Sequence, residues 1–174
     1  MEKQSNHKVS AVALVLFEDD TGPNIILIQR PAYQGVHSAQ VALPGGKHDP
    51  EDASVEYTAR REVSEEVGLT LSTTHLLGPL TPLYIPVSNF IVHPHLYLFP
   101  ERNLMLTPNS REVESIFYLP IHHLLNEENV RVANRMLGSG LTLPTPYFEY
   151  EGREIWGATA MILSELKQLW LENR

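Results

Sequence analysis

The sequence predicts an α/β (α+β) protein, in which a mixed β-sheet is sandwiched between α-helices. Two observations support this fold class. Short apolar stretches of strand length alternate irregularly with longer stretches of helical pattern, which is typical of a mixed sheet with helices on its faces. Hydrophobic residues make up 43% and charged residues 20% of the chain, as expected for a folded globular protein. With 174 residues and no internal repeat, we expect one domain over residues 1–174.

The chain begins with a predicted hairpin. Residues 9–19 form an apolar run typical of a buried strand, residues 21–24 (Thr-Gly-Pro-Asn) predict a turn, and residues 25–30 predict the paired strand. A short apolar piece follows at residues 41–43. The Pro-Gly-Gly-Lys sequence at residues 44–47 is not expected to continue regular structure.

The next stretch carries a complete set of helix signals. Asp49 suits the N-cap and Pro50 the first helical position, while Gly68 suits the C-terminal stop. Val63 and Val67 are four residues apart and can anchor the helix to a sheet. We therefore expect a helix from Asp49 to Gly68.

The second half of the chain returns to strands and ends in a helix. Further strands are predicted over residues 75–88, 90–99 and 113–119. Residues 120–137 have a mostly helical pattern, with a strand at residues 130–133 as the alternative. Residues 144–148 (Pro-Thr-Pro-Tyr-Phe) predict a rigid turn, and residues 155–171 predict an amphipathic helix that closes the fold.

Composition excludes several classes of site. The chain has no cysteine, so disulfides, thiolate metal sites and cysteine nucleophiles are impossible. A formal net charge of −8 argues against a broad nucleic-acid or acidic-membrane surface, which needs clustered cations. Residues 1–10 lack the apolar core of a signal peptide, and the longest apolar run, residues 11–17, is too short to span a bilayer. We therefore expect a cytoplasmic protein with neither a nucleic-acid nor a membrane partner.

Three glutamates are crowded in the predicted helix. Positions i, i+3 and i+4 share one helical face, so Glu62, Glu65 and Glu66 would bring three carboxylates together. Like charges at this spacing cost roughly 0.2–0.5 kcal/mol per pair on an exposed helix. A solvated acidic face is one explanation. The other is a divalent cation, which would offset the repulsion.

Residues 44–69 resemble the signature of the Nudix hydrolases, a Gly-rich loop followed by a helix with clustered glutamates. The positions that match the end of this signature are Arg61, Glu62, Val63, Ser64, Glu65, Glu66, Val67 and Gly68. The loop is one residue longer than the usual signature, and Ala53 stands where its first glutamate is expected. Asp52 is adjacent and would take over that residue's role, which in the family is mainly to support the helix.

The resemblance implies a Mg²⁺ or Mn²⁺ site. By this resemblance, Glu62 and Glu66 would be metal ligands, and Glu65 would be a further ligand or the partner of a bound water. The Gly46 carbonyl would complete the site, as the corresponding carbonyl often does in the family. The physics agrees, because Mg²⁺ takes oxygen ligands from a few carboxylates together with waters and substrate phosphates. Arg61 would brace these carboxylates.

The resemblance also implies the chemistry. A metal-bound water would attack one phosphorus of a diphosphate while a glutamate removes its proton. Glu65 and Glu66 are candidates for catalytic residues. Glu112, beyond the signature, is the candidate for a fourth ligand or the general base. As an isolated residue, Glu112 would simply be an exposed charge at a strand edge.

Residues 27–46 narrow the resemblance to the coenzyme A diphosphatases of this family. Arg30, His37 and Gln40 match and are the candidate substrate-binding residues; outside such a role, Arg30 would be a surface cation and His37 a loop histidine bonded to backbone. Five positions depart from the pattern: Ile28, Pro31, Gln34, Ala39 and Leu43. Residues 147–163 resemble the closing segment of the same group.

The implied activity is cleavage of coenzyme A, or of an acyl derivative, to phosphopantetheine and adenosine 3',5'-bisphosphate. Hydrolysis of another nucleoside diphosphate derivative, such as ADP-ribose or a dinucleotide, is the alternative that the altered residues would allow. A non-catalytic nucleotide sensor is a further alternative, although such domains typically lose the signature carboxylates. Members of the family often form homodimers, which the sequence leaves open.

Overall fold

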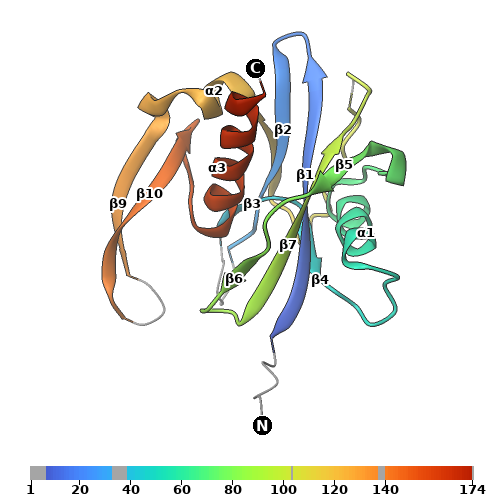
Figure 1. Cartoon of the computed structure of the whole chain (residues 1–174), viewed down its shortest axis with the longest axis horizontal. Coiled ribbons are helices and arrows are strands. Elements are labelled where there is room, and N and C mark those ends of the chain that lie inside the picture. The colour runs from blue at the N-terminus through green and yellow to red at the C-terminus, as the bar shows by residue number, and fades with distance from the viewer. Residues whose placement is uncertain (1–6, 33–38, 103, 137–139, 174) are drawn as a thin grey trace.

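The computed structural model describes residues 7–32, 39–102, 104–136 and 140–173 (Figure 1). Its strands are β1 (Lys8–Asp19), β2 (Gly22–Gln29), β3 (Val41–Ala42), β4 (Gly45–Lys47), β5 (Leu76–Pro79), β6 (Leu83–Ile85), β7 (Phe90–Leu98), β8 (Ser115–Pro120), β9 (Val130–Met136), β10 (Thr142–Tyr150) and β11 (Arg153–Ile155). Its helices are α1 (Val55–Val67), α2 (Ile121–Leu125) and α3 (Gly157–Glu172), with 3₁₀ turns at Thr73–His75 and Glu127–Asn129. None of the helices in the described ranges is both long and apolar enough to cross a membrane.

Eight of the strands form one mixed sheet, as predicted. Its central path is β3-β2-β1-β7-β5, with β4 paired to β1, β6 to β7 and β8 to β2. The β1–β2 pair is the predicted antiparallel hairpin. The β1–β7 pair is parallel and joins segments far apart in the chain, Lys8 with Phe90 through Leu16 with Leu98. A separate three-stranded sheet has the order β11-β10-β9.

Hydrophobic cores lie on both faces of the main sheet, because successive side chains of a strand point to opposite faces. One core unites Val15 of β1 with Val63 and Val67 of α1. The other unites Leu14 of β1 with Leu163 of α3. Figure 1 shows the result, with α1 on one side of the sheet and α3 on the other, beside β10. The predicted sheet between helices is confirmed.

The predicted start of the first helix at Asp49 is wrong. Asp49 and Asp52 instead close a turn, in which the Asp52 N–H donates to the Asp49 carbonyl at 3.0 Å. The helix begins after Ser54, whose extended backbone and side-chain oxygen, accepting from the Tyr57 N–H at 3.0 Å, make it the N-cap. The predicted end is confirmed, since Gly68 adopts the left-handed conformation at φ 71°.

Three other local predictions are corrected. Residues 45–47 of the Pro-Gly-Gly-Lys stretch do form a strand, β4, because glycine can approach β1 closely: a Cβ at Gly45 would collide with the β1 backbone. Of the predicted helix at residues 120–137, the described part up to Met136 is α-helical only in α2, with a 3₁₀ turn at Glu127–Asn129, and the alternative strand is the one realised, as β9. The predicted turn at residues 144–148 lies within β10. Because β11 pairs only with Phe148–Tyr150, the preceding part of β10 has an open edge, where proline is tolerated.

Candidate active site

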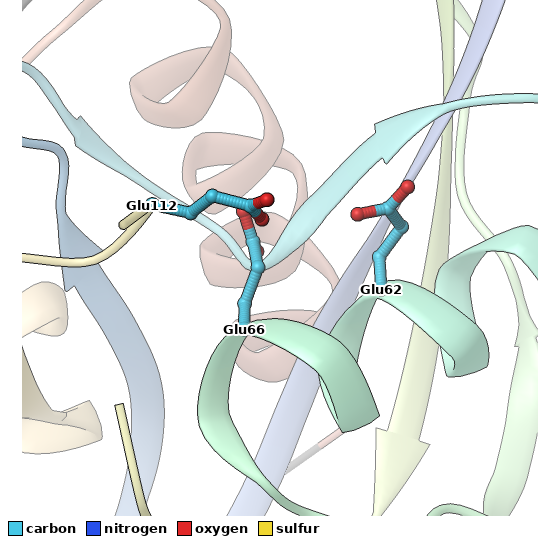
Figure 2. A group of neighbouring side chains, drawn as sticks. All are labelled: Glu62, Glu66 and Glu112. Atoms are coloured by element: carbon cyan, nitrogen blue, oxygen red, sulfur yellow. The ribbon is translucent and has the colours of Figure 1, made fainter. Parts of the chain in front are cut away.

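Three carboxylates meet at one end of α1. Oxygen atoms of Glu62, Glu66 and Glu112 all lie within 4.8 Å of one another. Glu62 and Glu66 are one turn apart on the helix, and Figure 2 shows the Glu112 side chain reaching toward them from a separate loop. Of the three glutamates expected to converge, Glu62 and Glu66 therefore do so, and Glu112 joins them where Glu65 does not.

Backbone hydrogen bonds at the end of α1 bring Glu112 to this position. The Asn109 N–H donates to the Glu66 carbonyl, and the Thr107 N–H donates to the Val67 carbonyl, both at 2.9 Å. The Glu112 N–H then donates to the Asn109 carbonyl at 2.9 Å, which closes a tight turn. These bonds use helix carbonyls that would otherwise lack a partner, and they hold the loop against the helix end.

Glu66 is the most buried of the three. It is only 4% exposed, and its Oε2 accepts a hydrogen bond from the Gly45 N–H at 2.8 Å. Burial raises the pKa of Glu66 to about 7; the Gly45 N–H and the Arg30 guanidinium oppose this shift, while Glu62 and Glu112 add to it. A cation bound next to Glu66 would stabilise its ionised form, which burial disfavours.

Glu62 is held between a cation and a glycine. Its Oε1 lies 2.9 Å from Arg61 Nη1. Burial raises the pKa of this carboxyl as well, and the charge of Arg61 works in the opposite direction. The carboxylate lies directly against Gly46, where a Cβ would fall on its atoms. The glycine is therefore required for the position of Glu62.

We predict that Gly46→Ala weakens the binding of Mg²⁺ or Mn²⁺ by about 10–100-fold, the range seen when a support of a metal ligand is lost. The new methyl group would displace the Glu62 carboxylate, while the rest of β4 keeps its pairing with β1. Titration of Mn²⁺ followed by its paramagnetic resonance would measure the affinity. The control is Gly152→Ala, which strains the backbone locally because Gly152 has a φ of 75°, but adds its methyl group to open space and lines neither cavity, so it should leave the metal affinity unchanged. Equal metal affinity in Gly46→Ala and the wild type would contradict the prediction.

The Asp52 side chain fixes Arg61 of α1. This contact agrees with the expectation that Asp52, next to Ala53, supports the helix. The Arg61 Nε and Nη2 atoms each donate to an oxygen of Asp52 at 3.0 Å. Thr58 Oγ1 donates to the same carboxylate at 2.8 Å. The hydrogen bonds from Arg61 hold the pKa of Asp52 well below its usual range, against the opposing effect of burial. With one end fixed, Arg61 presents Nη1 to Glu62 and Glu65.

We predict that Asp52→Asn lowers the free energy of unfolding at pH 7 by about 1–3 kcal/mol, because it leaves a charge-assisted pair half made. A carboxyl with a lowered folded pKa stabilises the protein above its unfolded pKa of about 3.9, and this stabilisation is lost as the pH falls below that value. Urea unfolding should therefore show a difference at pH 7 that shrinks toward pH 3. Asp49→Asn is the control, because Asp49 is 62% exposed and 3.8 Å from Arg61. A similar loss in both variants would refute a specific role of Asp52.

The other predicted site residues are placed as follows. Glu65 lies outside the three-carboxylate group; its side chain is 51% exposed and its Oε2 is 3.0 Å from Arg61 Nη1. Arg30 Nη2 donates to the Gly45 carbonyl at 3.5 Å, next to the cluster. The Gln40 carbonyl accepts from the Arg30 N–H at 3.0 Å. His37 lies outside the described residues. Roles in catalysis and substrate binding for these residues stay predictions.

Two adjoining cavities surround β4. The smaller, of about 320 Å³, is lined by the three clustered glutamates together with Arg30, Lys47 and Arg111. The larger, of about 1070 Å³, shares Arg30 and β4 as lining and extends over mostly apolar side chains. The sequence pattern did not mark Lys47 and Arg111 as candidate site residues. The available indication was their position beside candidate residues, since Lys47 follows the two glycines and Arg111 precedes Glu112.

The donor set fits a hard divalent cation. Three carboxylates supply the oxygen ligands that Mg²⁺ and Mn²⁺ take in proteins, and the adjoining cavity leaves room for water and phosphate oxygens. Arg61 contacts only Glu62 of the three, so the buried Glu66 has no salt-bridge partner among the described residues. A bound cation would neutralise the negative charge of the three carboxylates.

Comparisons with known proteins agree with this geometry. A family model for the Nudix domain matches residues 7–137. The mitochondrial coenzyme A diphosphatase NUDT8 of Homo sapiens is 37% identical over 135 residues, which cover 78% of this chain and 57% of the human protein. This chain thus spans little more than half the length of that relative. An uncharacterized Nudix hydrolase, NudL, of Yersinia enterocolitica is 37% identical over 146 residues, covering 84% of this chain and 73% of the relative.

The fold is also found among solved structures. A MutT/nudix family protein from Enterococcus faecalis superposes with a TM-score of 0.67 at 14% sequence identity. The match covers 98% of this chain and 64% of the other. At 14% sequence identity, this similarity shows that the two proteins share a fold.

Proposed function

The chain belongs to the Nudix family, and from this premise we propose that it is a Mg²⁺- or Mn²⁺-dependent diphosphatase that cleaves coenzyme A or an acyl-coenzyme A. The products would be phosphopantetheine, or its acyl form, and adenosine 3',5'-bisphosphate. The observation that carries the proposal is the group of three carboxylates on the cavity beside Arg30 and Lys47. The identity of 37% with a protein named as a coenzyme A diphosphatase supports the choice of substrate.

Glu62 and Glu66 would hold the metal, with the Gly46 carbonyl as a further donor and Glu65 as the partner of a coordinated water, while Glu112 would be either a fourth ligand or the general base. When bound, the cation supplies charge neutralisation at the diphosphate and lowers the pKa of a water molecule. Glu66 suits a ligand role, because it is buried and its other interaction, with the Gly45 N–H, fixes its orientation. Such fixed carboxylates pre-organise a site.

Glu112 suits the role of general base. It is exposed, reaches the cluster from a loop and lines the same cavity as Arg30. In the proposed reaction, a water molecule gives a proton to Glu112 as its oxygen attacks one phosphorus atom. The bond from this phosphorus to the bridging oxygen breaks, and the second phosphate leaves with both electrons of that bond. Arg30, Lys47 and Arg111 would donate hydrogen bonds to the phosphate oxygens, where negative charge gathers.

Another nucleoside diphosphate derivative is the second candidate substrate. Ile28, Pro31, Ala39 and Leu43 depart from the pattern of the coenzyme A diphosphatases; Gln34, the fifth departure, lies outside the described residues. Leu43 lines the larger cavity, and Pro31 lines the smaller one. Changed side chains at these positions would allow ADP-ribose or a dinucleotide to bind in place of coenzyme A.

The test compares turnover of coenzyme A, ADP-ribose and a dinucleoside polyphosphate with Mg²⁺, with products separated by chromatography. Cleavage of coenzyme A well above the other two would support the proposal. Preference for another compound would retain the reaction and replace the substrate. Binding without turnover of any compound would favour a nucleotide sensor. In that case, the carboxylate cluster would need a role other than catalysis.

A further inference from the structure

Trp156 lies where α3 begins, and it lines the larger cavity. The two residues that follow it in the chain, Gly157 and Ala158, are small and line the same cavity. A Cβ added at Gly157 would have no atom within 4 Å, so the space beside the tryptophan is open. A ligand in the cavity can therefore reach Trp156 without a large neighbouring side chain in its path.

One face of the Trp156 ring is covered by Arg135 of β9. The guanidinium carbon of Arg135 lies 4.6 Å from the centre of the Trp156 ring and 5.4 Å from the centre of the Tyr147 ring. Its Nη2 atom donates to Glu154 Oε2 at 2.6 Å, which fixes the cation against both rings. With one face covered by this cation, a ligand would stack on the other face of Trp156.

The position of Arg135 has a cost for the fold. Its side chain is only 17% exposed, and its Nε atom is buried without a hydrogen-bond partner among the residues that the structure describes. An unpaired buried N–H opposes folding and is rare in native proteins, so its presence needs a reason. Support of Trp156 is such a reason. The cation holds the ring and draws its π electrons, which favours contact of the other face with an electron-rich ring.

Hydrogen bonds connect the start of α3 to the cations of the candidate active site. The Thr159 hydroxyl, three residues after Trp156, donates to the Val41 carbonyl of β3 at 3.3 Å. The preceding residue, Gln40, accepts from the Arg30 N–H through its carbonyl at 3.0 Å. Arg30 in turn lines both cavities. A ligand with its phosphates near Arg30 can therefore extend past β3 toward Trp156.

We propose that Trp156 is a stacking site for the purine base of the substrate, with Arg135 as the support of its ring and the diphosphate near Arg30. This inference rests on the proposed function and names the residue that recognises the base. It applies equally to coenzyme A and to ADP-ribose, because both carry adenosine next to the diphosphate. Stacking suits the mostly apolar lining of the cavity, since the π face of a base needs no hydrogen-bond partner.

The test uses the Trp170→Phe protein, in which Trp156 is the only tryptophan. Trp170 lies near the end of α3 and does not line the cavity. AMP and ribose 5-phosphate differ only in the base, so both are titrated without metal. We expect AMP to quench the fluorescence of Trp156. In calorimetry, AMP should bind about tenfold more tightly than ribose 5-phosphate, as expected for one stacked base.

Two substitutions of Trp156 separate the aromatic ring from apolar bulk. Trp156→Leu should remove most of the tenfold advantage of AMP, whereas Trp156→Phe, which keeps an aromatic ring, should retain most of it. Arg135→Met removes the cation behind the ring and should give an intermediate advantage. With coenzyme A as substrate, Trp156→Leu should raise KM about tenfold at unchanged kcat, because stacking stabilises the bound substrate and the transition state equally. The Trp170→Phe protein should keep the wild-type KM.

The titrations do not depend on turnover, so they separate this inference from the proposed function. Absence of turnover would refute the proposed function, while AMP binding that depends on Trp156 would still support the stacking site. Absence of AMP binding, equal affinity for AMP and ribose 5-phosphate, or unchanged AMP affinity in Trp156→Leu would each overturn the inference. Weaker binding of phosphopantetheine in Trp156→Leu, with AMP binding unchanged, would assign the ring to the other half of coenzyme A and would also overturn it.

Discussion

Replacement of Glu66 by glutamine should lower kcat by about a thousandfold, which corresponds to about 4 kcal/mol of transition-state stabilisation. The amide keeps the shape of the side chain and can still accept the hydrogen bond from the Gly45 N–H. It removes one negative charge from the three-carboxylate group, so the loss reports the charge and not the fold. Steady-state turnover of coenzyme A with saturating Mg²⁺ would measure the effect. Glu51→Gln, at an exposed glutamate that lines neither cavity, should retain wild-type activity.

The same variant should be more stable than the wild type at alkaline pH when metal is removed. Burial raises the pKa of Glu66 to about 7, above its unfolded value of about 4.3, so the folded state disfavours the ionised form. The wild type should therefore lose stability as the pH rises from about 4.3 to about 7, and this contribution should be absent in Glu66→Gln. Melting temperatures recorded in EDTA across this range would show it. Parallel curves for the two proteins would contradict the interpretation of Glu66 as a buried carboxyl with a raised pKa.

Removal of divalent metal should abolish activity, and Mg²⁺ should stabilise the folded protein. A cation that binds only the folded state at a concentration 100 times its dissociation constant adds about 2.7 kcal/mol to the free energy of unfolding. For a chain of this size, the melting temperature should rise by about 5–10 °C. Differential scanning calorimetry with and without Mg²⁺ would measure the shift.

Glu66→Gln provides the control for this metal effect, since it should show a much smaller shift than the wild type. Glu51→Gln should shift as the wild type does. A second control is ionic strength, because monovalent salt at matched ionic strength screens surface charges without occupying the carboxylate group. If saturating Mg²⁺ changed neither activity nor melting temperature, the interpretation of the carboxylates as a metal site would be wrong.

The sequence was sufficient for the parts of the fold that depend on local patterns. The hairpin of β1 and β2 follows from two apolar runs around a turn, and the end of α1 follows from Gly68. The start of α1 was misplaced because Asp49 and Pro50 carry good helix signals. The structure instead has a turn closed by Asp52, whose carboxylate reaches Arg61. This turn depends on Arg61, which lies nine residues after Asp52 and is not part of the local pattern.

The three-stranded sheet was missed for a similar reason. The proline-containing part of β10 looks like a turn in isolation and is a strand only because β9 pairs with it, Thr145 opposite Ala133. Within the site, helical spacing brings Glu62 and Glu66 together, but it could not show that Glu65 lies outside the group, with its side chain half exposed and paired with Arg61. Nor could local pattern place Glu112, whose approach depends on Asn109 bonding to the Glu66 carbonyl.

The parallel pairing of β1 with β7 has a consequence for when the candidate site is assembled during synthesis of the chain. Loop closure between distant segments is slow compared with the formation of a hairpin or a helix. A nascent chain that has reached only Leu69 already contains the whole Nudix signature, yet it lacks β7, against which β1 is fixed, and it lacks Glu112. The β1–β2 hairpin and α1 can form early from local contacts. The group of three carboxylates is therefore a late product of folding, because it cannot be complete before Glu112 has been synthesised.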